Sequence, residues 1–332
     1  MMMASYFMFW LWFVWRIWCM LKIYVIGLVA LAFQMISKHN KMPVHVDEDG
    51  LVAIVTGGAS GIGLQITRIL TTKNNMHVII ACRSREEARK AIDGIKSELS
   101  IARVEYMHLD LSSLASVREF VTEFHNRDLP LNLLINNAGV MFVPYSETTD
   151  GLEEHFQVNY FAHLTLTSLL LPLLKQSALD DQYSRVVNVS SVTHCAASYE
   201  DIQPNFAEVR EYSPHAAYVA SKLAIIMATY KLSEELKESK CKVTVNALHP
   251  GVINSDLYKH LHWSIKWVID VIRMSFFKTT KEGAESVVYV ALSPDLETMS
   301  GGYYDNCKVA KSSSISYSKA LQDDLWDKFK SL

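Results

Sequence analysis

From residue 50 onward, short apolar runs alternate with longer segments in which apolar residues recur at helical spacing. Several runs are continuously apolar, such as 78–81 and 133–135, which is typical of strands buried on both faces of a parallel sheet. The pattern predicts strands at 51–56, 77–82, 103–109, 131–136, 184–190, 242–248 and 301–305. It predicts helices at 61–73, 85–99, 113–126, 151–175, 216–238 and 281–292. This alternation predicts right-handed βαβ units and an α/β fold with a doubly wound parallel sheet.

Residues 3–36 depart from this pattern because they are almost wholly apolar. The window 17–36 has the roughly 20 residues that a helix needs to cross a bilayer, provided that Lys22 extends toward an interface. A cleaved signal peptide would carry positive charge before the apolar run, whereas Lys38 and Lys41 follow it. We therefore expect a membrane anchor, either a transmembrane helix or a shallow hairpin. By the positive-inside rule the downstream domain faces the cytosol.

Composition narrows the class of protein. The chain has 332 residues and a net charge of −3, with no long block of Lys or Arg, so nucleic-acid binding is not indicated. Its five cysteines are scattered, which favours free thiols in a reducing compartment over a disulfide framework. No Cys and His residues have the spacing of a zinc site, so no metal is expected.

A glycine-rich turn follows the first predicted strand and opens a helix. Glycines allow a tight turn and close approach of the backbone to a pyrophosphate, and the helix N-terminus adds free N–H donors. A glycine-rich stretch alone is often only a turn, but the strand–turn–helix setting favours a dinucleotide site. The residues expected there are Thr56, Gly57, Ser60, Gly61, Ile62 and Gly63.

The end of the second strand bears on the choice of cofactor. Arg83 stands where sites that select NAD commonly place an acidic residue for the ribose hydroxyls, and a cation there accommodates the 2′-phosphate of NADP. Arg83 therefore favours NADP(H), with NAD(H) as the alternative. Arg83 and Arg85 could instead pair with Glu86 or Glu87 on the helix surface. Asp110, at the end of the third strand, could accept a hydrogen bond from an adenine amino group or cap the next helix.

Tyr218 and Lys222 are four residues apart, which puts both on one face of a helix. A lysine cation close to a tyrosine hydroxyl favours the phenolate and lowers its pKa. Ser191 lies 27 residues before Tyr218. A Tyr-x-x-x-Lys pair alone is weak evidence, but after a nucleotide-type turn it predicts a proton-transfer site that needs no metal.

These motifs together resemble the classical short-chain dehydrogenase/reductase family, over roughly residues 50–306. The residues that carry the resemblance, in family order, are 56–63, Asn136-Asn137-Ala138-Gly139, Asn159, Ser191, Tyr218 with Lys222, and Pro250-Gly251. The extended sugar-nucleotide epimerases share the Tyr-Lys pair but have a different glycine spacing. Within the family the chain resembles the membrane-associated, retinol-dehydrogenase-like branch, through 81–83, 134–141 and 249–252.

The resemblance implies a Rossmann fold and hydride transfer between nicotinamide and a carbinol or carbonyl carbon. It implies that Tyr218 is the general acid or base, that Lys222 lowers its pKa and bonds the nicotinamide ribose, and that Ser191 bonds the substrate oxygen. Asn159 would hold a water that links Lys222 to solvent. The other implied cofactor contacts are Asp110, Leu111, Asn137, Ala138, Gly139, Pro250, Gly251, Val252 and Ser255. Family members often pair through the helix that carries Tyr218, so a homodimer is a further expectation.

The stretch 258–278 combines tryptophans and other apolar residues with interleaved cations. The resemblance implies that it is a lid over the substrate, and such a helix also suits a membrane surface. The alternative is an amphipathic helix packed on its own domain. The apolar stretch favours a lipophilic alcohol or carbonyl that enters from the membrane. The family resemblance implies a polyprenol first and a retinoid second. A reductase of small polar carbonyls and a non-catalytic nucleotide-binding scaffold are the rival hypotheses.

The domain organisation follows from these expectations. Residues 1–40 are expected to be the membrane anchor, 41–49 a linker, 50–306 the single catalytic domain and 307–332 a C-terminal tail. The expected location is the endoplasmic reticulum or a lipid droplet, with the catalytic domain facing the cytosol.

Overall fold

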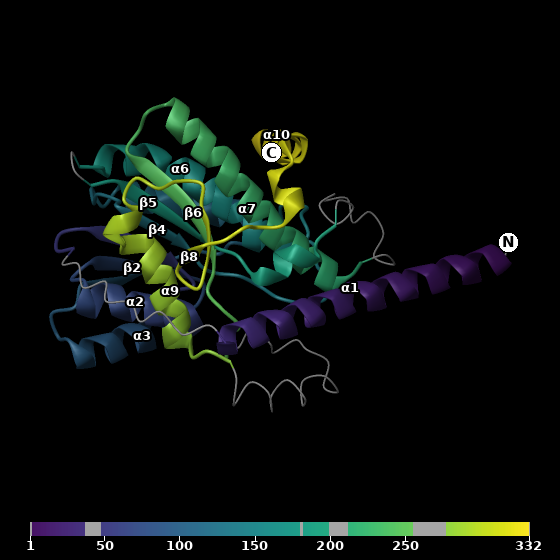
Figure 1. The fold of residues 1–332 in the computed structure, drawn as a ribbon. Coiled ribbons are helices and arrows are strands. Elements are labelled where there is room, and N and C mark those ends of the chain that lie inside the picture. Colours follow the sequence, from purple (N-terminus) through teal and green to yellow (C-terminus); the bar gives the residue numbers. More distant parts are fainter. Residues whose placement is uncertain (1, 37–47, 180–181, 199–211, 255–276, 332) are drawn as a thin grey trace.

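The computed structural model describes residues 2–36, 48–179, 182–198, 212–254 and 277–331. A long N-terminal helix, α1 (Met2–Ile36), is followed by one α/β domain (Figure 1). The predicted doubly wound, largely parallel sheet with helices on both faces is confirmed.

The sheet has eight strands in the order β3-β2-β1-β4-β5-β6-β7-β8. Their bounds are β1 (Val52–Thr56), β2 (His77–Cys82), β3 (Val104–His108), β4 (Leu133–Asn136), β5 (Ser184–Val189), β6 (Val243–His249), β7 (Tyr303–Asp305) and β8 (Lys308–Val309). All pairings are parallel except that of β7 with β8, a short strand that the hydrophobic pattern did not predict. The strand order reverses between β1 and β4, and such a reversal opens a crevice at the carboxyl ends of the strands.

Helices cover both faces of the sheet (Figure 1), and alternate residues of a strand face the two helical layers. Val78 and Ile80 of β2 face one layer, and Ile79 faces the other. The first layer contains α2 (Gly61–Lys73), α3 (Arg85–Glu98) and α9 (Thr280–Leu292). The second contains α4 (Leu114–His125), α6 (Ala162–Ser177) and α7 (Pro214–Glu238). The described residues also form three short 3₁₀ turns, η2 (Val192–Ala196), η6 (Pro294–Leu296) and η7 (Ser314–Tyr317).

The helix predicted at 151–175 is broken in the structure. It consists of α5 (Glu154–Phe156), a π-helical turn η1 (Gln157–Phe161) and α6. A π turn adds one residue to the helical repeat and is frequent at functional sites. Here it carries Asn159, whose side chain bonds a neighbouring loop and α7.

Helix α10 (Lys319–Lys330) packs on the outer side of α7. Leu321, Leu325 and Trp326 of α10 are buried in the same core as α7, and the Trp326 indole N–H donates to Glu235 at 2.8 Å. The segment expected to be a C-terminal tail therefore contributes to the core. A homodimer that paired through this side of α7 would first have to displace α10.

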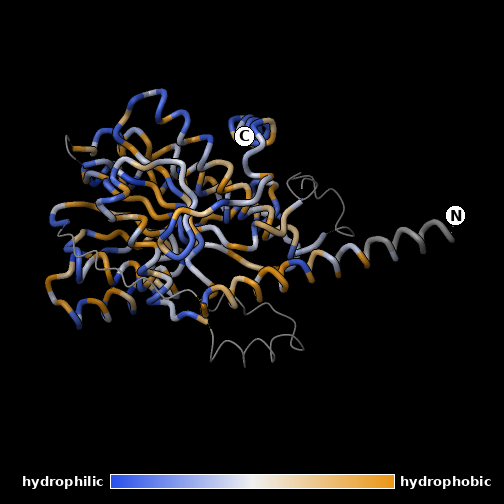
Figure 2. The backbone as a smooth tube through the Cα atoms, viewed as in Figure 1, coloured by the Kyte–Doolittle hydropathy of each residue, from blue (hydrophilic) through white to orange (hydrophobic). Residues whose placement is uncertain are grey.

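Helix α1 is unbroken, so it contains no turn that would make it a hairpin. Figure 1 shows that its N-terminal half projects beyond the domain and that its C-terminal half runs along it. Ile23 and Leu31 are buried, while Val25 and Val29 are exposed. Within the described residues, Ile17–Ile36 is the one helical stretch long and apolar enough to cross a membrane, and Figure 2 shows its apolar character.

Candidate active site

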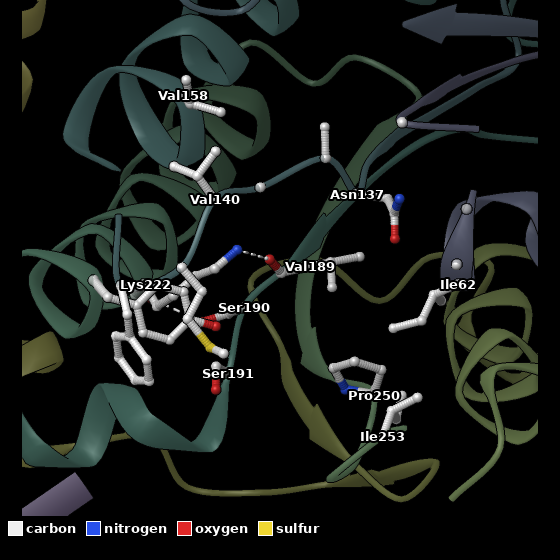
Figure 3. A pocket seen from close by; sticks show the side chains of 18 of the residues that line it. Ile62, Asn137, Val140, Val158, Val189, Ser190, Ser191, Lys222, Pro250 and Ile253 are labelled. Carbon is white, nitrogen blue, oxygen red and sulfur yellow. Dashed lines mark hydrogen bonds between the residues drawn. The ribbon is translucent and has the colours of Figure 1, made fainter. Parts of the chain in front are cut away.

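A cavity of about 860 Å³ lies at the carboxyl ends of β1, β4, β5 and β6. Figure 3 shows Ile62 and Asn137 across the cavity from Lys222 and Ser191. Most residues expected at the site line this cavity: Gly57, Ser60, Gly61, Ile62, Gly63, Arg83, Asp110, Leu111, Asn137, Ala138, Gly139, Ser191, Tyr218, Lys222, Pro250, Gly251 and Val252. Thr56 and Asn159 do not line the cavity, but each bonds a residue that does, Asn137 and Val140 respectively.

The turn between β1 and α2 is packed too closely for side chains. A Cβ on Gly63 would lie 2.1 Å from the carbonyl oxygen of Gly57, whose own φ of +65° favours glycine. Thr56 fixes the neighbouring loop, because its Oγ1 accepts from the backbone N–H groups of Asn137 at 2.9 Å and Ala138 at 3.0 Å. The turn and the loop therefore form one rigid cradle.

The N-terminus of α2 opens into this cradle. Ser60 is the N-cap residue, but its side chain makes no capping hydrogen bond. The first N–H groups of a helix have no partners within it, and their dipoles favour an anion. Because Ser60, Gly61 and Ile62 line the cavity, this end of it suits a pyrophosphate.

Arg83 lies at the rim of the cavity and is exposed. Within the described part of the chain its guanidinium has no carboxylate within ion-pairing distance, and Glu86 pairs instead with Lys90 at 2.7 Å. Asp110 also lines the cavity, and its Oδ1 accepts from the backbone N–H of Ser112 at 2.9 Å and from the Ser112 hydroxyl at 2.7 Å. Asp110 therefore orders the turn before α4, while the N-cap of that helix is Ser113.

Tyr218 and Lys222 project from the start of α7 and are both buried. The Lys222 ammonium donates to the carbonyl of Val189 at 2.9 Å, a contact visible in Figure 3. Burial lowers the pKa of Lys222 to about 8. Burial also raises the pKa of Tyr218 to about 12, and a hydrogen bond with Ser191 opposes the rise. The pKa of Tyr218 is therefore raised, whereas the helical spacing predicts a lowering by Lys222, and the opposing effect comes from Ser191.

Ser191 ends β5 and caps the η2 turn, where its Oγ accepts from the Thr193 backbone N–H at 3.3 Å. Its neighbour Ser190 donates to the carbonyl of Lys222 at 2.7 Å. These bonds tie the end of β5 to α7. Ser191, Tyr218 and Lys222 all line the cavity.

Asn159 braces the cavity wall from behind. Its Oδ1 accepts from the Val140 N–H at 2.8 Å, and its Nδ2 donates to the Val140 carbonyl at 3.0 Å and to Ser221 Oγ at 2.9 Å. A Cβ on Gly139 would lie 3.0 Å from Asn159 Oδ1 and 3.4 Å from Lys222 Nζ. The side chain of Asn159 therefore positions the loop beside Lys222, and a role in holding a water stays a prediction.

Two parts of the cavity wall, His249 and helix α1, were not predicted from the sequence. His249 lines the cavity, and burial lowers its pKa to about 3, so it is neutral at physiological pH. Helix α1 supplies a further section of wall, with Ile23, Tyr24, Gly27, Leu28 and Leu31. The available signal was the presence of small and polar residues in an otherwise apolar helix, namely Gly27 and Gln34.

Gln34 joins α1 to the loop after β6. Its Oε1 accepts from the Val252 N–H at 2.9 Å, and its Nε2 donates to the Val252 carbonyl at 3.3 Å. The expected contact Ser255 lies outside the described residues, as does the lid stretch except for its last two members. Of these, Phe277 lines the cavity and Lys278 pairs with the loop at Val252 and Asn254.

A nucleotide cradle that faces Ser191, Tyr218 and Lys222 across one cavity is the arrangement that the resemblance implies for a nicotinamide-dependent oxidoreductase. Residues 51–264 match the family model described as short chain dehydrogenase. The chain belongs to the short-chain dehydrogenase/reductase family and is an oxidoreductase with a nicotinamide cofactor.

Relatives and solved structures agree with this assignment. The chain is 41% identical to human polyprenol dehydrogenase over 313 residues, which cover 93% of each chain. It is 37% identical to mouse retinol dehydrogenase 12 over 285 residues, which cover 85% of this chain and 86% of the relative. The structure resembles the NADP active-site complex of RhlG from Pseudomonas aeruginosa, with a TM-score of 0.62, 25% identity, and coverage of 79% of this chain and 96% of that one. The predicted branch of the family is confirmed.

Proposed function

We propose that this chain transfers hydride between NADP(H) and a long lipophilic alcohol or its aldehyde, with a polyprenol as the first candidate. The observation that carries the proposal is the position of Ser191, Tyr218 and Lys222 in a cavity that is also lined by the apolar helix α1. The similarity to polyprenol dehydrogenases over almost the whole chain supports the substrate class.

Tyr218 is the proposed general acid for reduction and the general base for oxidation. With a pKa of about 12, its hydroxyl is protonated at neutral pH and can donate to the alkoxide that develops when a carbonyl is reduced. Ser191, which bonds Tyr218, is proposed to donate a hydrogen bond to the same oxygen. The bound nicotinamide supplies or accepts the hydride.

Lys222 is proposed to hold the nicotinamide ribose and to favour the phenolate when the reaction runs toward oxidation. Its ammonium already reaches the Val189 carbonyl at the edge of the cavity, beside Gly139. Asn159 is proposed as a positioning residue, because it fixes the Val140 backbone and through it the loop beside Lys222. The N–H groups at the start of α2 are proposed to bind the pyrophosphate.

The preference for NADP(H) over NAD(H) rests on Arg83. Its guanidinium is exposed at the cavity rim, and no described carboxylate neutralises it. A free guanidinium there suits the 2′-phosphate, to which it can donate two parallel hydrogen bonds.

The location proposed for the enzyme is a membrane, with the endoplasmic reticulum as the first candidate and the domain in the cytosol. Helix α1 supports anchoring because Ile17–Ile36 has the length and hydropathy of a membrane span. Its exposed residues Val25, Val29 and Phe33 are apolar, which suits contact with lipid.

A retinoid is the second candidate substrate, favoured by the similarity to retinol dehydrogenases. The test uses the full-length protein purified in detergent, with polyprenol, retinol and the two aldehydes, each offered with both cofactors. Tyr218→Phe is the catalytic variant, and Tyr289→Phe on α9, outside the cavity, is its matched control.

We expect turnover of polyprenol or its aldehyde, a loss of about 10²-fold or more in Tyr218→Phe, and normal activity in Tyr289→Phe. Arg83→Ala should lower the activity with NADP(H) and leave that with NAD(H) nearly unchanged. Equal activity of Tyr218→Phe and wild type would exclude the proposed chemistry. Faster turnover of retinol than of polyprenol would move the assignment to the retinoid.

A further inference from the structure

The C-terminal half of α1 is apolar, and one of its faces forms part of the cavity wall. Ile23, Tyr24, Gly27, Leu28 and Leu31 line the cavity, and they recur at the three- and four-residue steps that mark one face of a helix. Ile23 is 4% exposed and packs into the core that contains Tyr218. This face of α1 therefore touches the domain at the active site.

Gly27 leaves a gap in that face. Among the described residues, no atom lies within 4 Å of a Cβ placed on Gly27, although Gly27 lies in the cavity wall. Glycine in the middle of a helix costs roughly 1 kcal/mol relative to alanine. Space that the described side chains leave open beside a helical glycine has room for part of a ligand.

The gap lies at the rim of the cavity. Leu28, the next residue, lines the cavity and is also 57% exposed, so the cavity opens along the outer side of α1. The exposed neighbours on that side include Val25, at 57%, and Leu21, at 48%. An apolar path therefore leads from the cavity past Gly27 to the outer surface of the helix.

The size of the cavity requires such an exit for a long substrate. Its volume of about 860 Å³ falls within the roughly 300–1,000 Å³ of sites that hold one small molecule. The dinucleotide shares this volume, so the reacting end of a prenyl chain fits beside Tyr218 but its tail does not.

We propose that Gly27 is a specificity-determining residue, and that the gap it leaves is the exit through which the hydrocarbon tail of the substrate leaves the cavity along α1. The inference rests on the proposed function and narrows it, because an exit is needed for a chain longer than the cavity. The substrate class is thus a linear isoprenoid alcohol of many units, with its hydroxyl at Ser191 and Tyr218.

The experiment compares Gly27→Phe with two controls in full-length protein in detergent. Gly27→Ala changes the same residue without filling the gap, and Val29→Phe places the same ring on a residue of α1 that is 64% exposed and does not line the cavity. Each variant is assayed with a long-chain polyprenol and with prenol, its single-unit homologue. Binding of NADPH and of tritiated polyprenol is measured separately by equilibrium methods.

We expect Gly27→Phe to lower kcat/KM for the long alcohol by about tenfold or more, and to leave prenol turnover and NADPH binding unchanged within about twofold. Gly27→Ala and Val29→Phe should resemble wild type. An equal loss with both alcohols, or no loss with either, would overturn the proposal.

The binding measurement separates this inference from the proposed function. If wild type binds polyprenol without oxidising it, the proposed function fails, and loss of that binding in Gly27→Phe still supports the exit. If wild type binds no polyprenol, or Gly27→Phe binds it as well as wild type does, the exit is refuted.

Discussion

Replacing Gln34 with leucine tests whether α1 holds the loop 250–252, which is expected to cover the nicotinamide. Leucine is of similar size and cannot form either hydrogen bond to Val252. Gln34 lies outside the proposed catalytic group, so the change leaves Ser191, Tyr218 and Lys222 intact. The expected effect is weaker cofactor binding, because the loop 250–252 loses its attachment to the helix.

The magnitude follows from the partners that remain. The Val252 carbonyl keeps a second donor, the Lys278 N–H at 2.9 Å, so the loss of the 3.3 Å bond from Gln34 costs little. The Val252 N–H has Gln34 Oε1 as its partner at 2.9 Å and would be left without it. A half-buried N–H without a partner costs about 1–2 kcal/mol, which corresponds to about 5–30-fold in the Kd for NADPH.

The assay is titration of purified protein with NADPH, followed by fluorescence, together with kcat and KM for cofactor and substrate. Met35→Leu is the control, since this neighbour on α1 is 58% exposed and lines no part of the cavity. A Kd for Gln34→Leu within twofold of wild type would refute the reasoning. It would mean that Lys278 alone orders the loop.

Three further outcomes are expected. Gly63→Ala should abolish NADPH binding, because its Cβ would lie 2.1 Å from a backbone oxygen. Gly94→Ala, whose Cβ would have no described atom within 4 Å, should not affect binding, and nucleotide titration distinguishes the two variants. In carbonyl reduction, kcat/KM should be level below about pH 8 and fall above it as Lys222 loses its proton, while Tyr218, with a pKa of about 12, stays protonated; a level profile to pH 10 would contradict this. Trp326→Ala should lower stability by about 3–5 kcal/mol, seen as a lower thermal midpoint, because this buried ring joins α10 to α7.

The sheet and its nucleotide cradle could be predicted because their causes are local in sequence. Continuous apolar runs marked the buried strands, and the predicted strand at 77–82 has the same bounds as β2. Glycines marked the turn that backbone crowding requires, as at Gly63. The Tyr218 and Lys222 pair was visible because four residues make about one helical turn.

Features that depend on distant contacts could not be predicted. The π turn 157–161 is stabilised by Asn159 bonding a loop that the helical period does not encode. Tyr212, Glu153 and His155 form a buried cluster, with Tyr212 donating to Glu153 at 2.8 Å, although their spacing suggests no motif. Apart from Gly27 and Gln34, helix α1 is apolar on all sides over residues 23–36, so its inward face emerged only from packing.

The contact between Gln34 and Val252 spans 218 positions of the chain. At a synthesis rate of roughly 5–20 residues per second, α1 exists for on the order of 10–40 s before its partner loop has been made. During that interval its inward-facing residues, Ile23 and Leu31 among them, have no domain to cover them. The apolar helix therefore has to be shielded by lipid or by a chaperone while translation continues, and the wall of the cavity is completed only after the loop that follows β6 and Phe277 have been made.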